Sequence, residues 1–462
     1  MSKASMPSFE SGRASSSTPK IDACTIVPIL ACAYSAIIGP LIYFAFPPAL
    51  SLQGVMESRI EQRMFWPAMA AISIVLAVRN WSRLGRGTLP PNIICLLAYL
   101  TFAGASVFWA FKPELSFIRF SQEVMVLTSI VLPAMLAVRT ADLTRGLFLC
   151  FAFAAILNVL FVFGNSPATI KLVNGYPGYF TGKNLLGEFS AIALVLAFRE
   201  VLCPGGRRAL GILIVIVAVW LLFWSNSKTA LGLAVLVPFV AGLTLFAAKR
   251  MRISPATILL SIPICYFVFS GITGINMYRI SYMLYGDSTF SRRSIIWEFA
   301  LKEIERRPLF GWGYQSFWLV GPDGPNIVDA PAFSFIKNMP NAHNGYYDTM
   351  LEMGYVGYAL LLIFIFATIY GIGRMAERDP PRAWLLLSLA LYVIIHNGLE
   401  STWMRAFDLM WVVFALVAAE TGRHWQHLKL ERVAYGRRMP PRRGRRTEAG
   451  PRASAVEPRR LQ

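Results

Sequence analysis

The chain has 462 residues, of which 56 % are hydrophobic and 15 % are charged, and its net charge is +19. Soluble globular domains usually carry about 25 % charged residues, so the composition excludes an ordinary soluble domain. The mean hydropathy is +0.52, and apolar stretches recur near the length of about 20 residues that crosses a bilayer. These features predict an all-α polytopic membrane protein.

About twelve transmembrane helices are predicted, of which the sixth and the eleventh are the shortest. They cover 23–46, 63–79, 91–111, 122–138, 144–163, 184–198, 209–224, 229–248, 255–275, 345–371, 383–398 and 404–421. The transmembrane domain therefore extends over 23–422. A Ser-rich N-terminal tail (1–22) and an Arg- and Pro-rich C-terminal tail (423–462) are expected to be disordered. No cleavable signal peptide is expected, because 1–20 has no apolar core. No internal repeat is visible, which disfavours a transporter.

The distribution of basic residues predicts the orientation. Lys and Arg accumulate in cytoplasmic loops, and they do so in every second loop when both termini are placed in the cytoplasm. The tail 423–462 contains twelve Lys and Arg against three Glu. Nucleic acid is one partner for such a cluster, but a basic segment after a last span normally sets topology and contacts anionic lipids. We therefore expect membrane lipids, and no nucleic acid, as partners.

The segment 276–344 is the one large extracytoplasmic loop of this topology. Helical spacing of apolar residues predicts a short amphipathic helix on the bilayer surface from Arg293 to Ile304, ended by Pro308. An apolar stripe alone would also suit a cap packed on the bundle. Arg292 and Arg293, however, place cations at a helix start, where the helix dipole disfavours them. This arrangement predicts an anion nearby.

Three further polar clusters are predicted at the same outer surface, each at the start of a helix. They are Gly182-Lys183-Asn184, Ser225-Asn226-Ser227-Lys228-Thr229 and His343-Asn344-Gly345. Helix N-termini bind anions through their free N–H groups and the dipole. The alternative is simple capping by Asn184 or Ser227, with the lysines reaching to water. The convergence of several clusters on one face favours an anionic ligand, with Lys183, Lys228, Asn184 and Asn344 as binding residues.

His343 is the candidate general base, because imidazole can accept a proton near neutral pH. Glu400, after the eleventh span, could orient His343, bind a sugar hydroxyl or pair with Arg405. His396 is expected to be a structural histidine. The six cysteines include no Cys-x-x-Cys pair, and no Asp-x-Asp or clustered His suggests a metal, so neither metal nor cofactor is expected.

These residues lie in motifs that together resemble those of a known family. They are Phe180-Thr-Gly-Lys-Asn-Leu-Leu-Gly187, Ser227-Lys-Thr-Ala-Leu-Gly232, Ser291-Arg-Arg-Ser-Ile-Ile-Trp297, Pro308-Leu-Phe-Gly-Trp-Gly313 and Ala342-His-Asn-Gly-Tyr-Tyr-Asp348 followed by Gly354 and Gly357. Over about 165–420 the chain resembles the O-antigen ligase and Wzy-type polymerase superfamily, and most of all its exopolysaccharide-polymerase branch in Gram-negative bacteria.

The resemblance implies a metal-independent glycosyltransferase in the bacterial inner membrane. Its donor would be a glycan on undecaprenyl diphosphate, used at the periplasmic face. His343 matches the family histidine that activates the acceptor, and Arg293 matches the loop arginine. Lys228 stands where relatives usually have arginine, which keeps the charge but loses the bidentate fork. Gly182 stands where many relatives have a residue such as histidine. A chain-length co-polymerase and export machinery are further implied partners.

Three functions are compatible with the sequence. The first is a polymerase that joins lipid-linked oligosaccharide units into exopolysaccharide. The second is a ligase that transfers the same donor to lipid A core or to protein. The third is a flippase or exporter of lipid-linked sugars, in which His343 is structural. The candidate residues gather at one face instead of along a central cavity, which favours a transferase. Six aromatic residues are expected to stack on sugars or to anchor the interface: Trp312, Tyr314, Phe317, Trp318, Tyr346 and Tyr347.

Overall fold

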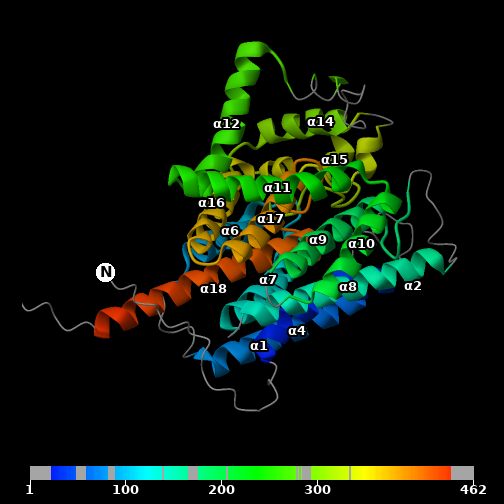
Figure 1. Ribbon diagram of the computed structural model, residues 1–462. Coiled ribbons are helices and arrows are strands. Elements are labelled where there is room, and N and C mark those ends of the chain that lie inside the picture. Colours follow the sequence, from blue (N-terminus) through cyan, green and yellow to red (C-terminus); the bar gives the residue numbers. More distant parts are fainter. Residues whose placement is uncertain are drawn as a thin grey trace, which may run out of the picture.

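The computed structural model describes residues 22–47, 59–81, 89–137, 140–164, 175–203, 206–276, 279, 282–283, 293–331 and 334–438, with side chains to 426. The described part is built from helices (Figure 1). They are α1 (Ala23–Ala33), η1 (Tyr34–Ile38), α2 (Gly39–Ala45), α4 (Ile60–Arg79), α6 (Pro91–Ser106), η2 (Val107–Trp109), α7 (Pro113–Leu136), α8 (Thr140–Phe163), α9 (Lys183–Leu202), α10 (Arg208–Ser225), α11 (Lys228–Met251), α12 (Pro255–Thr273), α14 (Arg293–Arg306), α15 (Pro325–Val328), η4 (Phe335–Asn338), α16 (Gly345–Ala376), α17 (Pro380–His396) and α18 (Leu409–Arg438).

Eight helices of the described residues are long and apolar enough to cross a membrane. They are Ala23–Ala45, Pro91–Trp109, Pro113–Leu136, Asp142–Phe163, Arg208–Ser225, Lys228–Met251, Pro255–Thr273 and Gly345–Ala376. Each coincides with a predicted span, so the polytopic all-α class is confirmed.

The other four predicted spans also coincide with helices, but these do not qualify by length and composition. α17 is too short, and α9 carries Lys183, Glu188, Arg199 and Glu200. α4 begins with a polar turn, and α18 turns polar after Ala419. The total of twelve spans therefore remains a prediction.

The start and end of the last helix differ from the prediction. The chain from Thr402 to Asp408 is a series of turns, so the helix begins at Leu409 and not at 404. α18 then continues to Arg438, beyond the predicted boundary at 422. The first part of the basic tail is thus helical and not disordered, whereas 439–462 and almost all of 1–22 lie outside the described residues.

α9 is the central helix of the bundle. Every residue from Leu186 to Ala197 is buried, and the helix packs against α8, α10, α11 and α17. Its small residues, including Gly187, Ser190 and Ala193, let neighbouring helices approach closely. α12 is the opposite case, because only 6 % of its apolar window is buried. It projects from the bundle (Figure 1), although it still contacts α11 and α16.

The motif Pro308–Gly313 inserts into a break in α16. Gly354 interrupts the helix with φ +63°, and a Cβ atom there would lie 2.2 Å from the carbonyl oxygen of Leu309. The amide of Tyr355 donates to Pro308, and the amide of Trp312 donates to Leu351. Gly311 has φ +66°, and a Cβ there would also collide with α16. Two glycines therefore let these backbones cross in contact, since neither position accommodates a side chain.

The large loop forms a cap with its own apolar core over the start of α16. α14 supplies Ile296, Phe299, Ala300 and Ile304. Of the predicted stripe of Arg293, Trp297, Ala300 and Ile304, the last two lie in this core and Trp297 is also buried. The loop aromatics Trp312, Phe317 and Trp318 are buried in the same core, and Tyr314 is buried in the main bundle. The expectation that these four side chains stack on sugars or anchor the interface is therefore wrong, because their rings are not accessible. Between 276 and 344, residues 277–278, 280–281, 284–292 and 332–333 lie outside the described residues.

Candidate active site

His343 lies in a tightly held loop at the start of α16. Its φ of +49° is unusual for a residue with a side chain. The conformation is fixed from both sides: its own amide donates to Oδ1 of Asn341 (2.9 Å), and the amide of Asn344 donates to Oγ of Ser401 (3.0 Å). A strained residue held in this way is a frequent property of functional sites.

Glu400 lies in the turn after α17 and faces His343. Nδ1 of His343 is 2.9 Å from Oε2 of Glu400. This turn is joined to α16, because the amide of Gly345 donates to the carbonyl oxygens of Asn397 and Glu400. Of the three predicted roles for Glu400, the contact with His343 is present, and a pair with Arg405 is absent among the described contacts.

Arg293 approaches Glu400 from the cap. Its Nη2 donates to Oε1 of Glu400 at 2.6 Å, and its Nη1 donates to the carbonyl oxygen of Leu399. The cation at the start of α14 thus has an anion nearby, as the sequence predicted, and the protein itself supplies this anion. Arg293, Glu400 and His343 keep 19, 18 and 32 % of their side chains exposed, so a ligand can reach the cluster.

Two of the predicted helix starts are linked to the same carboxylate. Nδ2 of Asn184 donates to Oε1 of Glu400 (3.3 Å), and Oγ of Ser227 donates to Oδ1 of Asn184 (3.3 Å). The predicted convergence of α9, α11 and α16 on one site is therefore present. Lys228 is exposed beside Ser227, and Lys183 is half-buried at the start of α9.

Asn344 caps α16. Its Oδ1 accepts from the amides of Tyr346 and Tyr347, and its Nδ2 donates to Gly398. Both ends of the side-chain amide are engaged within the protein, and its role in ligand binding remains a prediction. Arg292 lies outside the described residues.

The environment of Glu400 favours its ionised form. Burial alone raises the pKa of this carboxyl, but the hydrogen bond from His343 and the charge of Arg293 outweigh burial, so the pKa lies below its usual range. A carboxylate at Nδ1 selects the tautomer with hydrogen on that nitrogen. Nε2 then carries the free lone pair, and among the described residues it has no hydrogen-bond partner.

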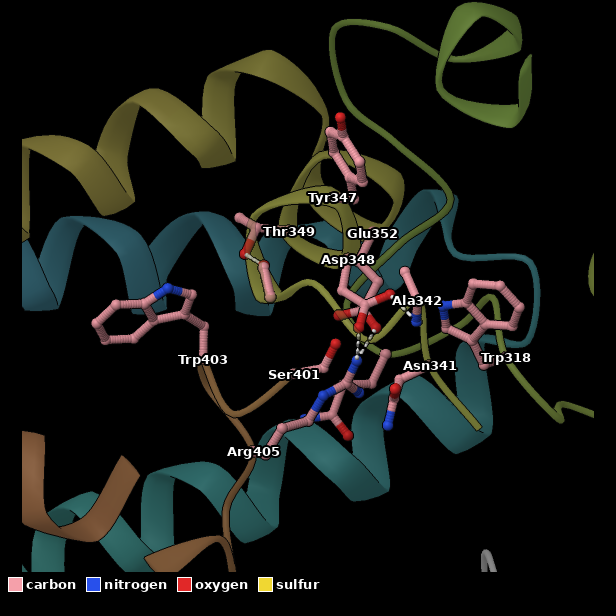
Figure 2. Close-up of polar contacts among 12 residues, drawn as sticks. Trp318, Asn341, Ala342, Tyr347, Asp348, Thr349, Glu352, Ser401, Trp403 and Arg405 are labelled. Carbon is pink, nitrogen blue, oxygen red and sulfur yellow. Dashed lines mark hydrogen bonds and ion pairs between the residues drawn. The ribbon is translucent and has the colours of Figure 1, made fainter. Parts of the chain in front are cut away.

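A second charged cluster lies beneath the His343 loop, and sequence reasoning missed it. Arg405 lies 3.4 Å from Asp348 and 2.8 Å from Glu352. Figure 2 shows this arginine reaching from the chain before α18 to both acids of α16. Asp348 also accepts from Trp318 (2.7 Å) and from the amide of Ala342 (3.0 Å). The available signal was the pair of acids at a four-residue spacing within an apolar span, where ionisable residues are costly.

His396 is a buried residue, as expected. Its Nε2 is 3.0 Å from Oε1 of Glu188, and both side chains are almost fully enclosed. No group of three or more His, Cys, Asp or Glu side chains suited to a metal ion occurs in the part of the chain that the structure describes.

Comparisons with known proteins agree with the motifs. The family model described as O-antigen ligase (Wzy_C) matches residues 213–362, a range that contains Lys228, Arg293 and His343. The exopolysaccharide production protein ExoQ of Rhizobium meliloti (strain 1021) is 25 % identical over 325 residues, which are 67 % of this chain and 72 % of that protein. The chain is therefore similar to the O-antigen ligase family over 213–362 and to an exopolysaccharide production protein over two thirds of its length. Glu400 and Asn184 lie outside the residues matched by the family model, so their connection with His343 and Arg293 comes from the structure.

Proposed function

We propose that this protein polymerises undecaprenyl-diphosphate-linked oligosaccharide units into exopolysaccharide at the periplasmic face of the inner membrane, with both termini in the cytoplasm. One observation carries the proposal: Glu400 binds His343 with one oxygen and Arg293 with the other. A base and a cation, both exposed at the same end of the bundle, are what displacement of a lipid diphosphate by a sugar hydroxyl requires.

The reaction follows from this arrangement. The acceptor hydroxyl transfers its proton to Nε2 of His343 while its oxygen attacks the anomeric carbon of the donor. The bond from that carbon to the diphosphate oxygen breaks, and polyprenyl diphosphate leaves with the bonding electrons. Neutral His343, Glu400 and Arg293 together carry no net charge before transfer and +1 after it. The positive charge thus develops as the leaving group becomes more negative, and preorganised charge of this kind is usually the largest catalytic contribution.

A ligase that transfers the glycan to lipid A core or to protein would use the same chemistry. The similarity to an exopolysaccharide production protein favours the polymerase. The glycans of a deletion strain distinguish the candidates. Accumulated single lipid-linked units support the polymerase, and accumulated long lipid-linked chains would indicate the ligase. Units retained on the cytoplasmic leaflet would instead indicate a flippase.

The proposed orientation has its own test. A single cysteine introduced at Pro322, which is exposed in the cap near Gly324, should react with a membrane-impermeant thiol reagent in intact cells whose outer membrane has been made permeable. A cysteine introduced at Arg378, between α16 and α17, is the matched control and should react only after the inner membrane is opened. The reverse labelling pattern would contradict both the orientation and a periplasmic site.

A further inference from the structure

A cavity of about 290 Å³ with a mixed polar and apolar wall is formed in part by chain segments that also contribute to the candidate active site. Its wall is formed by η1 and α2, the start of α4, the chain before and within the first turns of α9, and the chain that leads into α18. Under the proposed orientation, all four segments lie at the periplasmic end of the bundle. The residues considered above for the transfer of the glycan, His343, Arg293 and Glu400, are not part of this wall.

Residues of the cavity wall contain buried polar atoms that have no hydrogen-bond partner among the described residues. They are Oη of Tyr34, Oγ of Ser35 and Nη1 of Arg59. Tyr34 is only 3 % exposed, and Ser35 is also buried. Arg59 is otherwise engaged, with Glu61 (2.7 Å) and the carbonyl oxygen of Phe46 (2.8 Å). An unsatisfied buried polar group costs about 1–3 kcal/mol, so three at one cavity point to a ligand that satisfies them.

The chemistry of the wall suits a neutral sugar better than a phosphate. Tyr43, Phe180 and Phe407 offer aromatic surface, and Glu188 and Asp408 offer carboxyl oxygens. Burial and the charge of Glu188 raise the pKa of Asp408 to about 7, so this group can donate as well as accept near neutral pH. Sugar hydroxyls both donate and accept, and the C–H face of a sugar ring packs on aromatic rings. The wall also contains the cation of Arg59, but Glu61 already pairs with it (2.7 Å), and Glu188 and Asp408 leave the wall without an excess positive charge that would favour a diphosphate.

Two chain segments connect the cavity with the active site. Asn184, which contacts Glu400, and Glu188, which lines the cavity, are one turn apart on α9. Glu400 and Asp408 lie in the same connection between α17 and α18. A glycan whose reacting sugar lies at His343 would therefore have a neighbouring sugar within reach of the cavity.

We propose that this cavity is a glycan subsite that binds a neutral sugar residue of the lipid-linked substrate or of the growing chain. The inference rests on the proposed function and adds a site at which the repeat unit is recognised. Every residue of the wall lies outside 213–362, the range matched by the family model.

The test is binding of sugar by the purified full-length protein in detergent. The probe is a set of oligosaccharides released by partial acid hydrolysis from the polysaccharide of the producing strain. Thr181 is exposed at the rim of the cavity, so Thr181→Trp should block it without disturbing the core. Thr273→Trp, at the exposed end of α12, is the matched control. We expect Thr181→Trp to weaken binding by at least about tenfold, which corresponds to about 1.4 kcal/mol, and Thr273→Trp to leave it unchanged.

A second variant tests the unsatisfied atoms directly. Tyr34→Phe removes only the hydroxyl and should weaken binding of the same oligosaccharides while leaving thermal unfolding unchanged or improved, since an unpaired buried group is removed. Unchanged binding in both Thr181→Trp and Tyr34→Phe would overturn the subsite. His343→Ala separates this proposal from the proposed function, because it should bind the oligosaccharides normally while forming no polymer.

The source of the sugar is distinguished with a labelled oligosaccharide in the polymerisation assay. If the label is incorporated into polymer by the unaltered protein but not by Thr181→Trp, the cavity binds the acceptor chain. Inhibition without incorporation identifies the donor unit. Normal polymer and normal binding in Thr181→Trp would refute the subsite but not the proposed transferase activity. A deletion strain without accumulated lipid-linked glycan would refute the transferase activity. The binding measurement would still test the cavity in that case.

Discussion

Two arginine clusters lie near the start of α16 and have different properties: the Arg293 cluster, with Glu400 and His343, and the Arg405 cluster, with Asp348 and Glu352. At Arg293, one carboxylate is shared by an arginine and a histidine, and all three side chains remain partly exposed. At Arg405, one arginine faces two carboxylates that are almost fully buried. The first cluster contains a group that can accept a proton near neutral pH and that a ligand can reach. The second contains no histidine, and its two carboxylates are almost fully buried, although Arg405 itself is 21 % exposed.

The buried cluster nevertheless determines where the base lies. Asp348 accepts the amide of Ala342, the residue before His343, and also the indole of Trp318. Arg405 draws the chain before α18 to α16, and Glu400 precedes Arg405 in that chain. The Arg405 cluster therefore joins the cap, α16 and the Glu400 turn, which are the three parts that supply the Arg293 cluster. We therefore expect mutations in the Arg293 cluster to lower activity and mutations in the Arg405 cluster to lower stability.

The largest effect is expected at His343. His343→Ala should lower polymer formation by about 10²- to 10⁴-fold, the usual contribution of a general base, with normal abundance and thermal unfolding. His343→Gln and His343→Asn test the role, because either can replace a hydrogen bond but neither can accept a proton at neutral pH. Polymerisation by purified protein from lipid-linked units is the measurement. Substantial polymer from both would reduce His343 to a positioning residue.

Glu400→Gln should cost almost as much without removing any atom of the base. If the amide oxygen faces Arg293, the amide nitrogen faces Nδ1 of His343 and donates to it. The imidazole then carries its hydrogen on Nε2, where it can no longer take a proton from the acceptor. The lost carboxylate also leaves protonated His343 without a counter-ion. We expect a loss of about 10²-fold or more in kcat, and a kcat near that of the unaltered protein would contradict the Glu400–His343 assignment.

The same substitution, arginine to methionine, compares the two clusters directly. Arg405→Met leaves two buried acids without their cation, which costs about 3–5 kcal/mol of stability. Arg293→Met exposes its partner to solvent, so it should lower activity strongly and stability little. Thermal unfolding and polymer formation, measured on both proteins, give the comparison. Equal loss of stability in both would show that Arg293 is a residue of the cap.

Arg293→Lys refines the role of the exposed arginine. If Arg293 holds the diphosphate mainly by charge, Arg293→Lys should keep much more activity than Arg293→Ala. If the planar fork is required to join Glu400, Leu399 and the substrate, both variants should fail alike. Normal polymer from Arg293→Ala at normal protein levels would remove Arg293 from the active site.

The sequence predicted the membrane-spanning helices and α14, because both depend on residues that are close together in the chain. Apolar length predicted the eight confirmed spans, and helical spacing predicted α14. Polar clusters at helix starts predicted the convergence of the starts of α9, α11 and α16. The contacts between distant segments were beyond such reasoning: Glu400 lies 107 residues from Arg293 along the chain, and its choice between His343 and Arg405 depends on how α17 and α18 pack.

The cap shows a second limit of sequence reasoning. Trp312, Phe317 and Trp318 have the composition of a sugar-binding surface or of an interfacial belt, and both readings assume exposure. Their burial follows from Gly354, whose break in α16 admits the segment Pro308–Gly313. The crossing of Pro308–Gly313 with α16 requires Gly354 and Gly311, but no periodic pattern in the sequence predicts it.

The smallest expected effect is a pH dependence of the cap. Glu303 lies buried on α14, where burial raises its pKa to about 7 against the opposing charge of Arg306. Its folded-state pKa thus lies above the unfolded value of about 4.3, so the folded protein binds more protons between these pH values. Cap stability should therefore fall as the pH rises from about 4 to about 7 and stay low above that range. Glu303→Gln should remove this slope, with an upper limit of about 4 kcal/mol. Glu298→Gln, which changes an exposed acid on the same helix paired with Lys302, should keep it. Limited proteolysis of the cap at pH 5 and pH 8 provides the measurement, and an identical pH dependence in the two variants would show that Glu303 is not its source.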